Sequence, residues 1–221
     1  MKGIGIAIII ALALVVAVVQ AGAQARAVLS SVSGKVEIKS PGEQTWQAAT
    51  VGMEVPIKAT ISTGFDGRAV LTLGASTLTV RPLTRLRLDE LSTQNNVTRT
   101  NLVMPVGRIR AEVKSTNGSK NDFTVHSALS TAAVRGTGFE TDGINLTVFE
   151  SIVAFLSQSG IGINVHNGET GVSTDGGSPS GGADQLDLDM AVDTETSGTG
   201  SGGLVGGLPG HGVGTITVTY Q

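Results

Sequence analysis

The sequence predicts an all-β protein with a single antiparallel-rich β domain, folded as a sandwich or a short β-solenoid. Three observations support this class. Apolar residues recur at every second position through the central part of the chain and seldom at helical spacing. Turn-forming dipeptides separate these runs, which follow one another at the spacing of roughly 8 to 12 residues that is typical of sandwiches and barrels. No convincing helical period appears after residue 27.

The first element is a secretory signal peptide over residues 1–27, expected to form a signal helix. Lys2 precedes an apolar run from Ile4 to Val19, and small residues in A-x-A spacing follow. We expect cleavage to give a mature N-terminus between Gln24 and Val28, which places the protein in the periplasm or outside the cell, without stable membrane insertion. The alternative is an uncleaved anchor, because the run is close to the shortest length that spans a bilayer.

The β domain is expected over residues 28–172, a length that can bury a sizeable core. The protein has no cysteine, so its stability must come from packing and not from disulfides. Residues 28–172 carry 13 basic and 12 acidic side chains, and residues 173–221 carry six acidic and no basic ones. A near-neutral domain argues against nucleic acid as a partner, because nucleic-acid binding needs a basic surface.

The strands are identified by side chains that alternate between the two faces. Leu86 and Leu88 are expected to point to one face, and Arg85 and Arg87 to the other. Similar alternation places Ile109, Ala111, Val113, Phe123, Val125, Ile144, Leu146 and Val148 inward. Four dipeptides are predicted to close hairpins: Asp66-Gly67, Asn117-Gly118, Asp142-Gly143 and Asn167-Gly168.

The last element is an acidic, low-complexity tail over residues 173–221, rich in Gly and Ser. Its composition buries too little apolar surface to order itself, so we expect it to be flexible. Its last residues, TITVTYQ, alternate as a strand would, and could add to the edge of this domain or of a neighbouring one.

The residues 131–142, TAAVRGTGFETD, raise the question of a phosphate-binding loop. A P-loop needs GxxxxGK[ST] followed by a helix, and here β-type residues follow. We therefore interpret Arg135-Gly136-Thr137-Gly138 as a structural corner, with Gly136 at positive φ and Arg135 reaching Glu140 or Glu150.

No catalytic or metal site is predicted, and no cofactor. The histidines at 126, 166 and 211 are far apart in the sequence, no G-x-S-x-G motif occurs, and Asp89 and Glu90 would point to opposite faces of a strand. A basic stripe remains as a candidate surface, with a solvated sheet face as the simpler interpretation: Arg81, Arg85, Arg87, Arg108 and Arg110.

Five segments follow one another along the chain in a recognisable order: GKVEIKSPGEQTWQAATVGMEV, ATISTGFDGRAVLTLGASTLTVRPLTRLRL, VGRIRAEV, DFTVHSALSTAAVRGTGFET and LTVFESIVAFLS. In this order they resemble the FecR domain, the extracytoplasmic part of iron-dicitrate-type signal regulators, over about residues 33–172. The resemblance implies an all-β, non-enzymatic domain that receives or relays a protein contact outside the cytoplasm. Only Met1 and Lys2 precede the apolar run, so a sigma-factor-binding segment is not expected there. The residues that match the family pattern, with structural roles, are Trp46, Gly52, Thr63, Gly64, Gly67, Arg68, Arg135, Gly136, Thr137 and Phe139.

Two functions remain open at this point. The preferred one is an exported module, expected to be monomeric, that binds a protein or another component of the cell envelope and relays a signal. The alternative is a structural subunit of the cell surface or matrix that self-associates through its tail and terminal strand.

Overall fold

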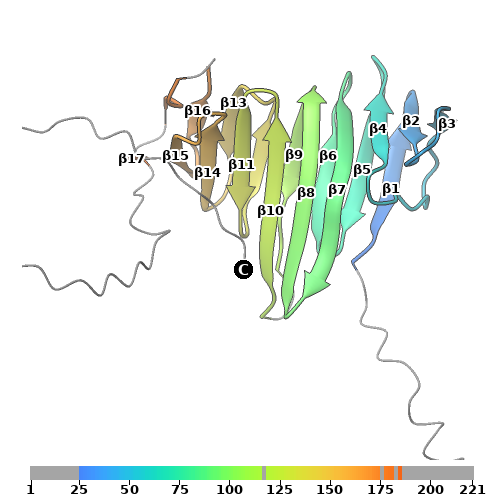
Figure 1. The fold of residues 1–221 in the computed structure, drawn as a ribbon, viewed down its shortest axis with the longest axis horizontal. Coiled ribbons are helices and arrows are strands. Elements are labelled where there is room, and N and C mark those ends of the chain that lie inside the picture. The colour runs from blue at the N-terminus through green and yellow to red at the C-terminus, as the bar shows by residue number, and fades with distance from the viewer. Residues whose placement is uncertain (1–24, 116–117, 175–176, 182–183, 186–221) are drawn as a thin grey trace, which may run out of the picture.

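The computed structural model describes residues 25–115, 118–174, 177–181 and 184–185. These residues form strands and loops, with no helix among them, so the all-β prediction is confirmed for this part of the chain. The strands make two sheets that lie one in front of the other in Figure 1. The signal helix and most of the glycine-rich tail fall outside the described residues. Within those residues, no helix has the length and apolar character to cross a membrane.

The first sheet has seven strands, which lie behind in Figure 1. In spatial order they are β1 (Ala27–Ser33), β5 (Arg68–Leu73), β6 (Ser76–Val80), β9 (Ile109–Glu112), β12 (Gly138–Thr141), β13 (Asn145–Val148) and β16 (Thr170–Val172).

The second sheet has ten strands and lies in front. In spatial order they are β17 (Asp184–Gln185), β15 (Gly162–His166), β14 (Ile152–Ser157), β11 (Ser130–Val134), β10 (Lys120–Ser127), β8 (Val97–Val106), β7 (Arg85–Gln94), β4 (Thr60–Thr63), β2 (Val36–Lys39) and β3 (Gln47–Ala48).

The chain builds both sheets together by passing back and forth between them. From β4 onward, the order of strands in each sheet follows the order in the sequence. Hairpins such as β5–β6 in one sheet and β7–β8 in the other alternate along the chain, which makes most pairs antiparallel. Between β8 and β10, a single strand, β9, lies in the seven-stranded sheet. The chain therefore returns to the ten-stranded sheet in the direction of β8, and β8 and β10 pair in parallel.

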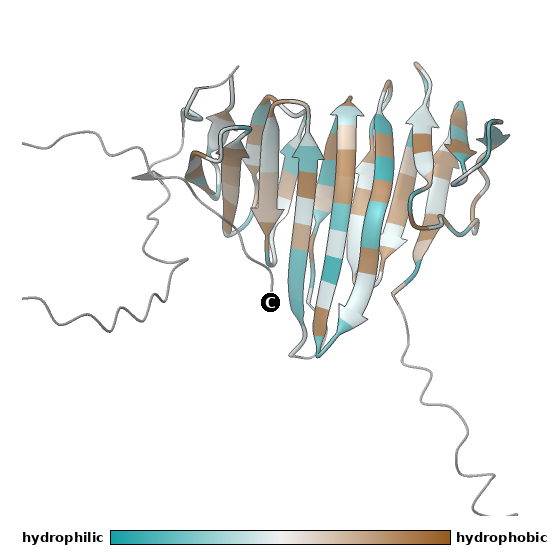
Figure 2. Ribbon diagram, in the orientation of Figure 1, coloured by the Kyte–Doolittle hydropathy of each residue, from teal (hydrophilic) through white to brown (hydrophobic). Residues whose placement is uncertain are grey.

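The core lies between the two sheets, where the inward residues of both meet. The alternation predicted from the sequence is seen as hydrophobic and hydrophilic bands along the strands in Figure 2. Leu86, Leu88, Ile109 and Val113 are all buried. Ile144 is an exception: it was expected inward, but it lies in the turn after β12 and is 44% exposed.

Phe139 connects the two sheets within this core. It is fully buried, and its ring meets that of Phe123 edge-on, with centroids 6.2 Å apart and an interplanar angle of 77°. Phe123 belongs to β10 and Phe139 to β12, so this aromatic pair bridges the front and back sheets.

The hairpin prediction from X-Gly dipeptides is correct for Asp142-Gly143, which joins the paired strands β12 and β13. It is wrong for Asp66-Gly67 and Asn167-Gly168, which lie where the chain changes sheets. The chain does reverse direction at these dipeptides, but the strand that follows joins the other sheet and does not pair with the strand before it. The prediction at Asn117-Gly118 falls on Asn117, which lies outside the described residues. The β7–β8 hairpin instead turns at Asn95 and Asn96, both at positive φ.

Contacts with the domain continue beyond Val172, the boundary suggested by composition. Ser173 is fully buried; its N–H donates to the Ile144 carbonyl (2.8 Å) and its hydroxyl to that of Leu129 (3.2 Å). Val172 and Ser180 exchange backbone hydrogen bonds, and β17 pairs with β15. The described part of the predicted tail therefore contributes to both sheets.

Candidate protein-interaction surface

Three loops at one end of the sandwich are joined by hydrogen bonds, and we call them the loop platform: residues 64–67, 81–84 and 106–108. They lie at the end where β4 and β8 finish, which is the upper end in Figure 1. Each loop carries the chain from the end of one strand toward the next, so a side chain that is not needed for the core can point into solvent.

Two buried threonines hold the loop platform together. Thr63 accepts a hydrogen bond on its hydroxyl from the Thr84 N–H (2.9 Å) and donates to the Arg81 carbonyl (2.6 Å). The Thr84 hydroxyl in turn accepts from the Arg108 N–H (2.9 Å) and donates to the Arg108 carbonyl (3.1 Å). Thr63, the first residue of the Thr-Gly pair in the family pattern, thus connects strand β4 to the second loop.

Glycines permit the close approach of these loops. A Cβ on Gly67 would lie 2.2 Å from the Lys35 carbonyl oxygen, and one on Gly107 would lie 2.3 Å from the Thr84 Cα. Gly64 donates its N–H to the same Lys35 carbonyl (2.8 Å). A side chain on Gly107 would push the second and third loops apart. Side chains on Gly64 and Gly67 would push the first loop away from Lys35, in the turn between β1 and β2, which gives these two glycines of the family pattern a packing role.

The loop platform exposes three large apolar side chains. Phe65 is 85% exposed, Leu83 59% and Val106 58%. Leu83 also has a φ of 57°, a conformation that is strained for a bulky residue, and its N–H is held by the Gly64 carbonyl (3.1 Å). Apolar side chains held out by a hydrogen-bonded framework are typical of protein-binding sites, because little order must be gained on binding.

A cleft of about 630 Å³ runs beside Leu83 and Val106 and is lined by four charged side chains. Arg81 donates to Glu140 (2.8 Å), and Arg108 lies 3.8 Å from Glu140 and 3.2 Å from Asp142. The Nε of Arg81 is buried without a hydrogen-bond partner within the part of the chain that the structure describes. The two positive and two negative side chains sum to zero, so the cleft presents charged groups without a net charge.

Asp142 is fixed by its own turn. Its carboxylate accepts from the N–H groups of Ile144 (3.0 Å) and Asn145 (2.7 Å). Burial works to raise the pKa of Asp142, but these hydrogen bonds, with those from the Asn145 side chain and Arg108, outweigh it and hold the pKa below its usual value. Asp142 therefore stays ionised and keeps Arg108 in place.

Trp46, the one tryptophan of the chain, lies on the outer face of the ten-stranded sheet, at the edge formed by β2 and β3. The Lys39 Nζ lies 5.3 Å and the Arg85 Cζ 5.7 Å from the centroid of its ring, both within cation–π range. Gly52, the other early residue of the family pattern, has a φ of 83° in the loop beyond β3, and its N–H donates to the Leu29 carbonyl of β1 (2.8 Å).

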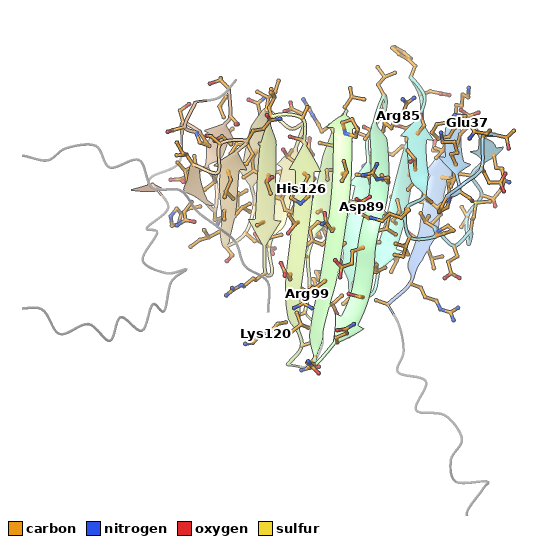
Figure 3. The ribbon with its side chains drawn as sticks, viewed as in Figure 1. Glu37, Arg85, Asp89, Arg99, Lys120 and His126 are labelled. Atoms are coloured by element: carbon orange, nitrogen blue, oxygen red, sulfur yellow. The ribbon has the colours of Figure 1, made fainter. Side chains whose placement is uncertain are left out.

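The predicted basic stripe does not form a single surface. Arg85 and Arg87 belong to the ten-stranded sheet, whereas Arg108 and Arg110 belong to the outer side of the seven-stranded sheet. Most of these charges are also paired. Arg87 bonds Asp89, which is labelled on the front sheet in Figure 3 and also pairs with Lys58 (3.2 Å). The hydrogen bond from Arg87 is the main reason why the pKa of Asp89 is lowered.

The Arg135-Gly136-Thr137 corner carries the chain from β11 in the front sheet to β12 in the back sheet. Thr137 is buried, and its carbonyl accepts from the Val113 N–H (2.9 Å). Two expectations are wrong. Gly136 does not have a positive φ. A Cβ added to it would lie 3.9 Å from its nearest neighbour, the Val113 carbonyl oxygen. Among the described residues Arg135 makes no ion pair, because Glu140 is bound by Arg81.

The remaining predicted site residues lie apart. Arg68 begins β5 and is exposed opposite Ser33 of β1. His126 is on the outer face of β10, as Figure 3 shows, with its Nδ1 3.0 Å from the Thr131 hydroxyl. Within the described residues, no three His, Asp or Glu side chains gather as metal ligands would. His211 lies outside the described residues.

His126 also lines a shallow groove of about 910 Å³ on the front sheet. The groove contains Glu90, Asp122 and the buried Oδ1 of Asn101, which has no hydrogen-bond partner among the described residues. Its lining includes the Thr131 hydroxyl, 3.0 Å from the His126 Nδ1. Among the described residues no carboxylate bonds the His126 ring, so the third group that would orient an imidazole for nucleophilic catalysis is not seen there.

Sequence interpretation missed Phe65, Leu83 and Val106 as surface residues. One signal was present: Phe65 stands between Gly64 and Asp66-Gly67, where a turn is expected and a core position is not. Leu83 and Val106 offered no such signal, because an apolar residue at a strand end is usually buried.

Comparison with protein families finds one match. Residues 59–154 match the family described as FecR protein. The resemblance stated from the sequence is therefore confirmed for this segment, which contains Thr63, Arg135 and Phe139 and begins after Trp46 and Gly52. No curated protein matches the chain.

Two solved structures, each described as a proposed anti-sigma factor from Parabacteroides distasonis ATCC 8503, are similar at low level. The one at 1.65 Å resolution has 13% identity and a TM-score of 0.46, and the one at 2.50 Å has 14% identity and a TM-score of 0.45. In both cases the match covers 59% of this chain and 62% of the other.

Proposed function

Because residues 59–154 of this chain form a FecR domain, we propose that the protein is a non-enzymatic module that binds another protein outside the cytoplasm and relays a signal by that contact. The observation that carries this proposal is the loop platform, with Phe65 85% exposed above a hydrogen-bonded framework. Aromatic side chains in such positions supply much of the free energy of protein association.

The partner surface we propose is apolar at its centre and polar at its margin. Phe65, Leu83 and Val106 would form the centre, and the paired charges of Arg81, Arg108, Glu140 and Asp142 the margin. Paired charges add orientation more than affinity, because they are already satisfied in the free protein.

Photo-crosslinking tests this proposal. A photoreactive residue in place of Phe65 should capture one defined protein in the extracytoplasmic fraction of the source organism. A matched control is Ile152, also exposed (47%) but located where β14 begins, at the opposite end of the sandwich. Equal capture of the same protein from both positions, or capture from Ile152 alone, would exclude the loop platform as the binding site.

Leu83→Gly gives a second test with the partner so identified. Glycine accepts the φ of 57° without strain, so the free energy of unfolding should stay the same or rise by about 0.5 to 1 kcal/mol. Binding should weaken by about tenfold, because an apolar contact is lost. Unchanged affinity in calorimetric titration would remove Leu83 from the interface.

We also propose that the protein is exported, with a mature N-terminus at Gln24 or Arg26. Cleavage after Ala27 would remove a residue that is 2% exposed, begins β1 and accepts a hydrogen bond from the Val55 N–H (2.8 Å). Cleavage after Ala23 also keeps Ala25, which packs against the core. Mass spectrometry of the secreted or periplasmic fraction checks this, and recovery of chains that retain Met1 in the membrane would contradict it.

A further inference from the structure

Trp46, Lys39 and Arg85 form a group that the loop platform does not use, and we call it the Trp46 site. Its two cations approach one ring, at 5.3 and 5.7 Å. Figure 3 shows Arg85 near the upper end of the front sheet, with Glu37 of β2 toward the edge.

Neither cation of the Trp46 site is neutralised by a carboxylate within the described ranges. Nine ion pairs join other charged side chains there, and neither Lys39 nor Arg85 belongs to one of them. Two acidic side chains of the same strands are paired with other cations: Glu37 of β2 with Lys35 (3.3 Å), and Asp89 of β7 with Lys58 and Arg87. Glu43, which stands between Lys39 and Trp46 in the sequence, is exposed and makes no ion pair in the described ranges. The site therefore presents two cations beside an aromatic ring, and neither forms an ion pair in the described ranges.

The chain contains a segment of complementary charge. Residues 187–195, DLDMAVDTE, hold four carboxylates and no basic group, with apolar residues between them. Carboxylates two residues apart in an extended chain project to the same side about 6.6 Å apart. Two such carboxylates can face the two cations of the Trp46 site together.

The same molecule's segment reaches the Trp46 site poorly. The described chain ends in β17, seven strand steps from β4, over which the site lies between β2 and β7. At about 4.8 Å per step the distance is about 34 Å. Glu195 is ten residues beyond Gln185, which corresponds to about 33 to 36 Å when fully extended. Asp187 and Asp189, two and four residues beyond Gln185, fall short, so one molecule cannot bring its four carboxylates to its own site together.

We propose that the Trp46 site binds the acidic segment 187–195 of a second copy of this chain. Such a contact joins two different surfaces, so each copy offers one free site and one free segment, and copies add head to tail. Because the attraction is between exposed charges, it weakens as salt shortens the screening length from about 30 Å at 0.01 M to about 8 Å at 0.15 M. This contact is independent of the proposed function, since Phe65 and Leu83 take no part in it.

The full mature chain allows a direct measurement, because Trp46 is its one tryptophan. Sedimentation and Trp46 fluorescence are followed against protein concentration at low and at high salt. We expect reversible association at low salt, a fluorescence change with the same concentration dependence, and loss of both at high salt. Association that salt leaves unchanged, or no association at any concentration, overturns the proposal. If adding salt changes the Trp46 fluorescence equally at every protein concentration, the segment binds within one molecule, and this result also overturns the proposal.

Charge variants locate the contact. Lys39→Gln with Arg85→Gln removes the two cations, and a second variant replaces Asp187, Asp189 and Asp193 by Asn and Glu195 by Gln. Each should weaken self-association by about tenfold or more. The matched control is Lys114→Gln with Arg135→Gln, which also removes two exposed cations that make no ion pair among the described residues, and it should associate as the native chain does.

Mixing the two defective variants gives the decisive result. One retains the acidic segment and the other retains the Trp46 site, so together they should form a one-to-one complex that neither forms alone. Failure of the mixture to associate, with both variants folded by circular dichroism, overturns the proposal. Phe65→Ser should leave self-association intact; if it abolishes association instead, the loop platform is the self-contact and the Trp46 site is not.

Discussion

Single side chains decide the geometry of the cleft beside the loop platform. Asp142 holds the β12–β13 turn through two backbone N–H groups and at the same time positions Arg108. An asparagine can keep the first role, because its amide oxygen still accepts hydrogen bonds, but it cannot form the ion pair.

Two substitutions at Asp142 separate these roles. Asp142→Ala should lower the free energy of unfolding by about 1 to 2 kcal/mol, because two backbone donors lose their acceptor. Asp142→Asn should cost about half as much or less. Urea denaturation at neutral pH checks the order, and equal losses would show that the ion pair, and not the turn, provides the stabilisation.

The pH dependence follows from the lowered pKa of Asp142. A carboxyl whose pKa is lower in the folded than in the unfolded state stabilises the fold above its unfolded pKa of about 3.9, and this contribution is lost as pH falls through the folded pKa. The stability difference between the native chain and Asp142→Asn should therefore shrink below about pH 4. A difference that is constant from pH 7 to 3 would contradict this.

At the scale of elements, the crossings between sheets depend on how closely neighbouring loops approach. Gly107 has a φ of 111°, and Thr84 lies where its Cβ would be. Gly136 is also at a crossing, but there the space is open. Two glycines in similar sequence contexts thus have different reasons to be there, and the structure explains that of Gly107 alone.

Gly107→Ala should lower the free energy of unfolding by about 2 to 4 kcal/mol, through backbone strain and overlap with Thr84. Gly136→Ala is the matched control and should change it by less than about 1 kcal/mol. Chemical denaturation of both variants tests this. A large loss at Gly136 would point to a role for that glycine that its surroundings do not indicate.

At the scale of the whole molecule, strands are added to both sheets in the order of the sequence. One lateral edge of the sandwich is therefore formed by the N-terminal strands and the other by the C-terminal strands. Residues 52–55 cover the edge strand β1, with the Leu29 N–H donating to the Met53 carbonyl (2.9 Å). Residues 177–181 cover β16 through Ser180. Covered edges resist unwanted strand pairing, which matters in a protein without disulfides.

Two shortened chains test how far the fold extends. A chain that ends at Gln185 should keep its melting temperature within about 2 °C, because it retains every described contact. A chain that ends at Val172 should melt about 5 °C lower or more, since the buried Ser173 and the pairing with Ser180 are lost. Circular dichroism during heating measures both, and equal melting temperatures would mean that residues 173–185 add nothing to stability.

The amino-acid sequence by itself determined the fold class, the inward faces of the strands and the family. Alternation is a local property, and the side-chain period of a strand transfers it directly to burial, as at Leu86, Leu88, Ile109 and Val113. The family resemblance is also a local property, because it depends on residue types at fixed positions along the chain. Thr63, Gly64, Arg135 and Phe139 could therefore be recognised without the structure.

Only the tertiary structure decided which strands pair across the two sheets and which side chains meet. An X-Gly turn reverses the chain whether the next strand joins the same sheet or the other, so Asp66-Gly67 and Asp142-Gly143 looked alike. Because β7 and β9 belong to different sheets, their arginines lie on opposite outer faces of the sandwich. Arg85 of β7 contacts Trp46, although the two residues are far apart in the sequence. Contacts of that kind depend on the order of strands in space, which alternation does not encode.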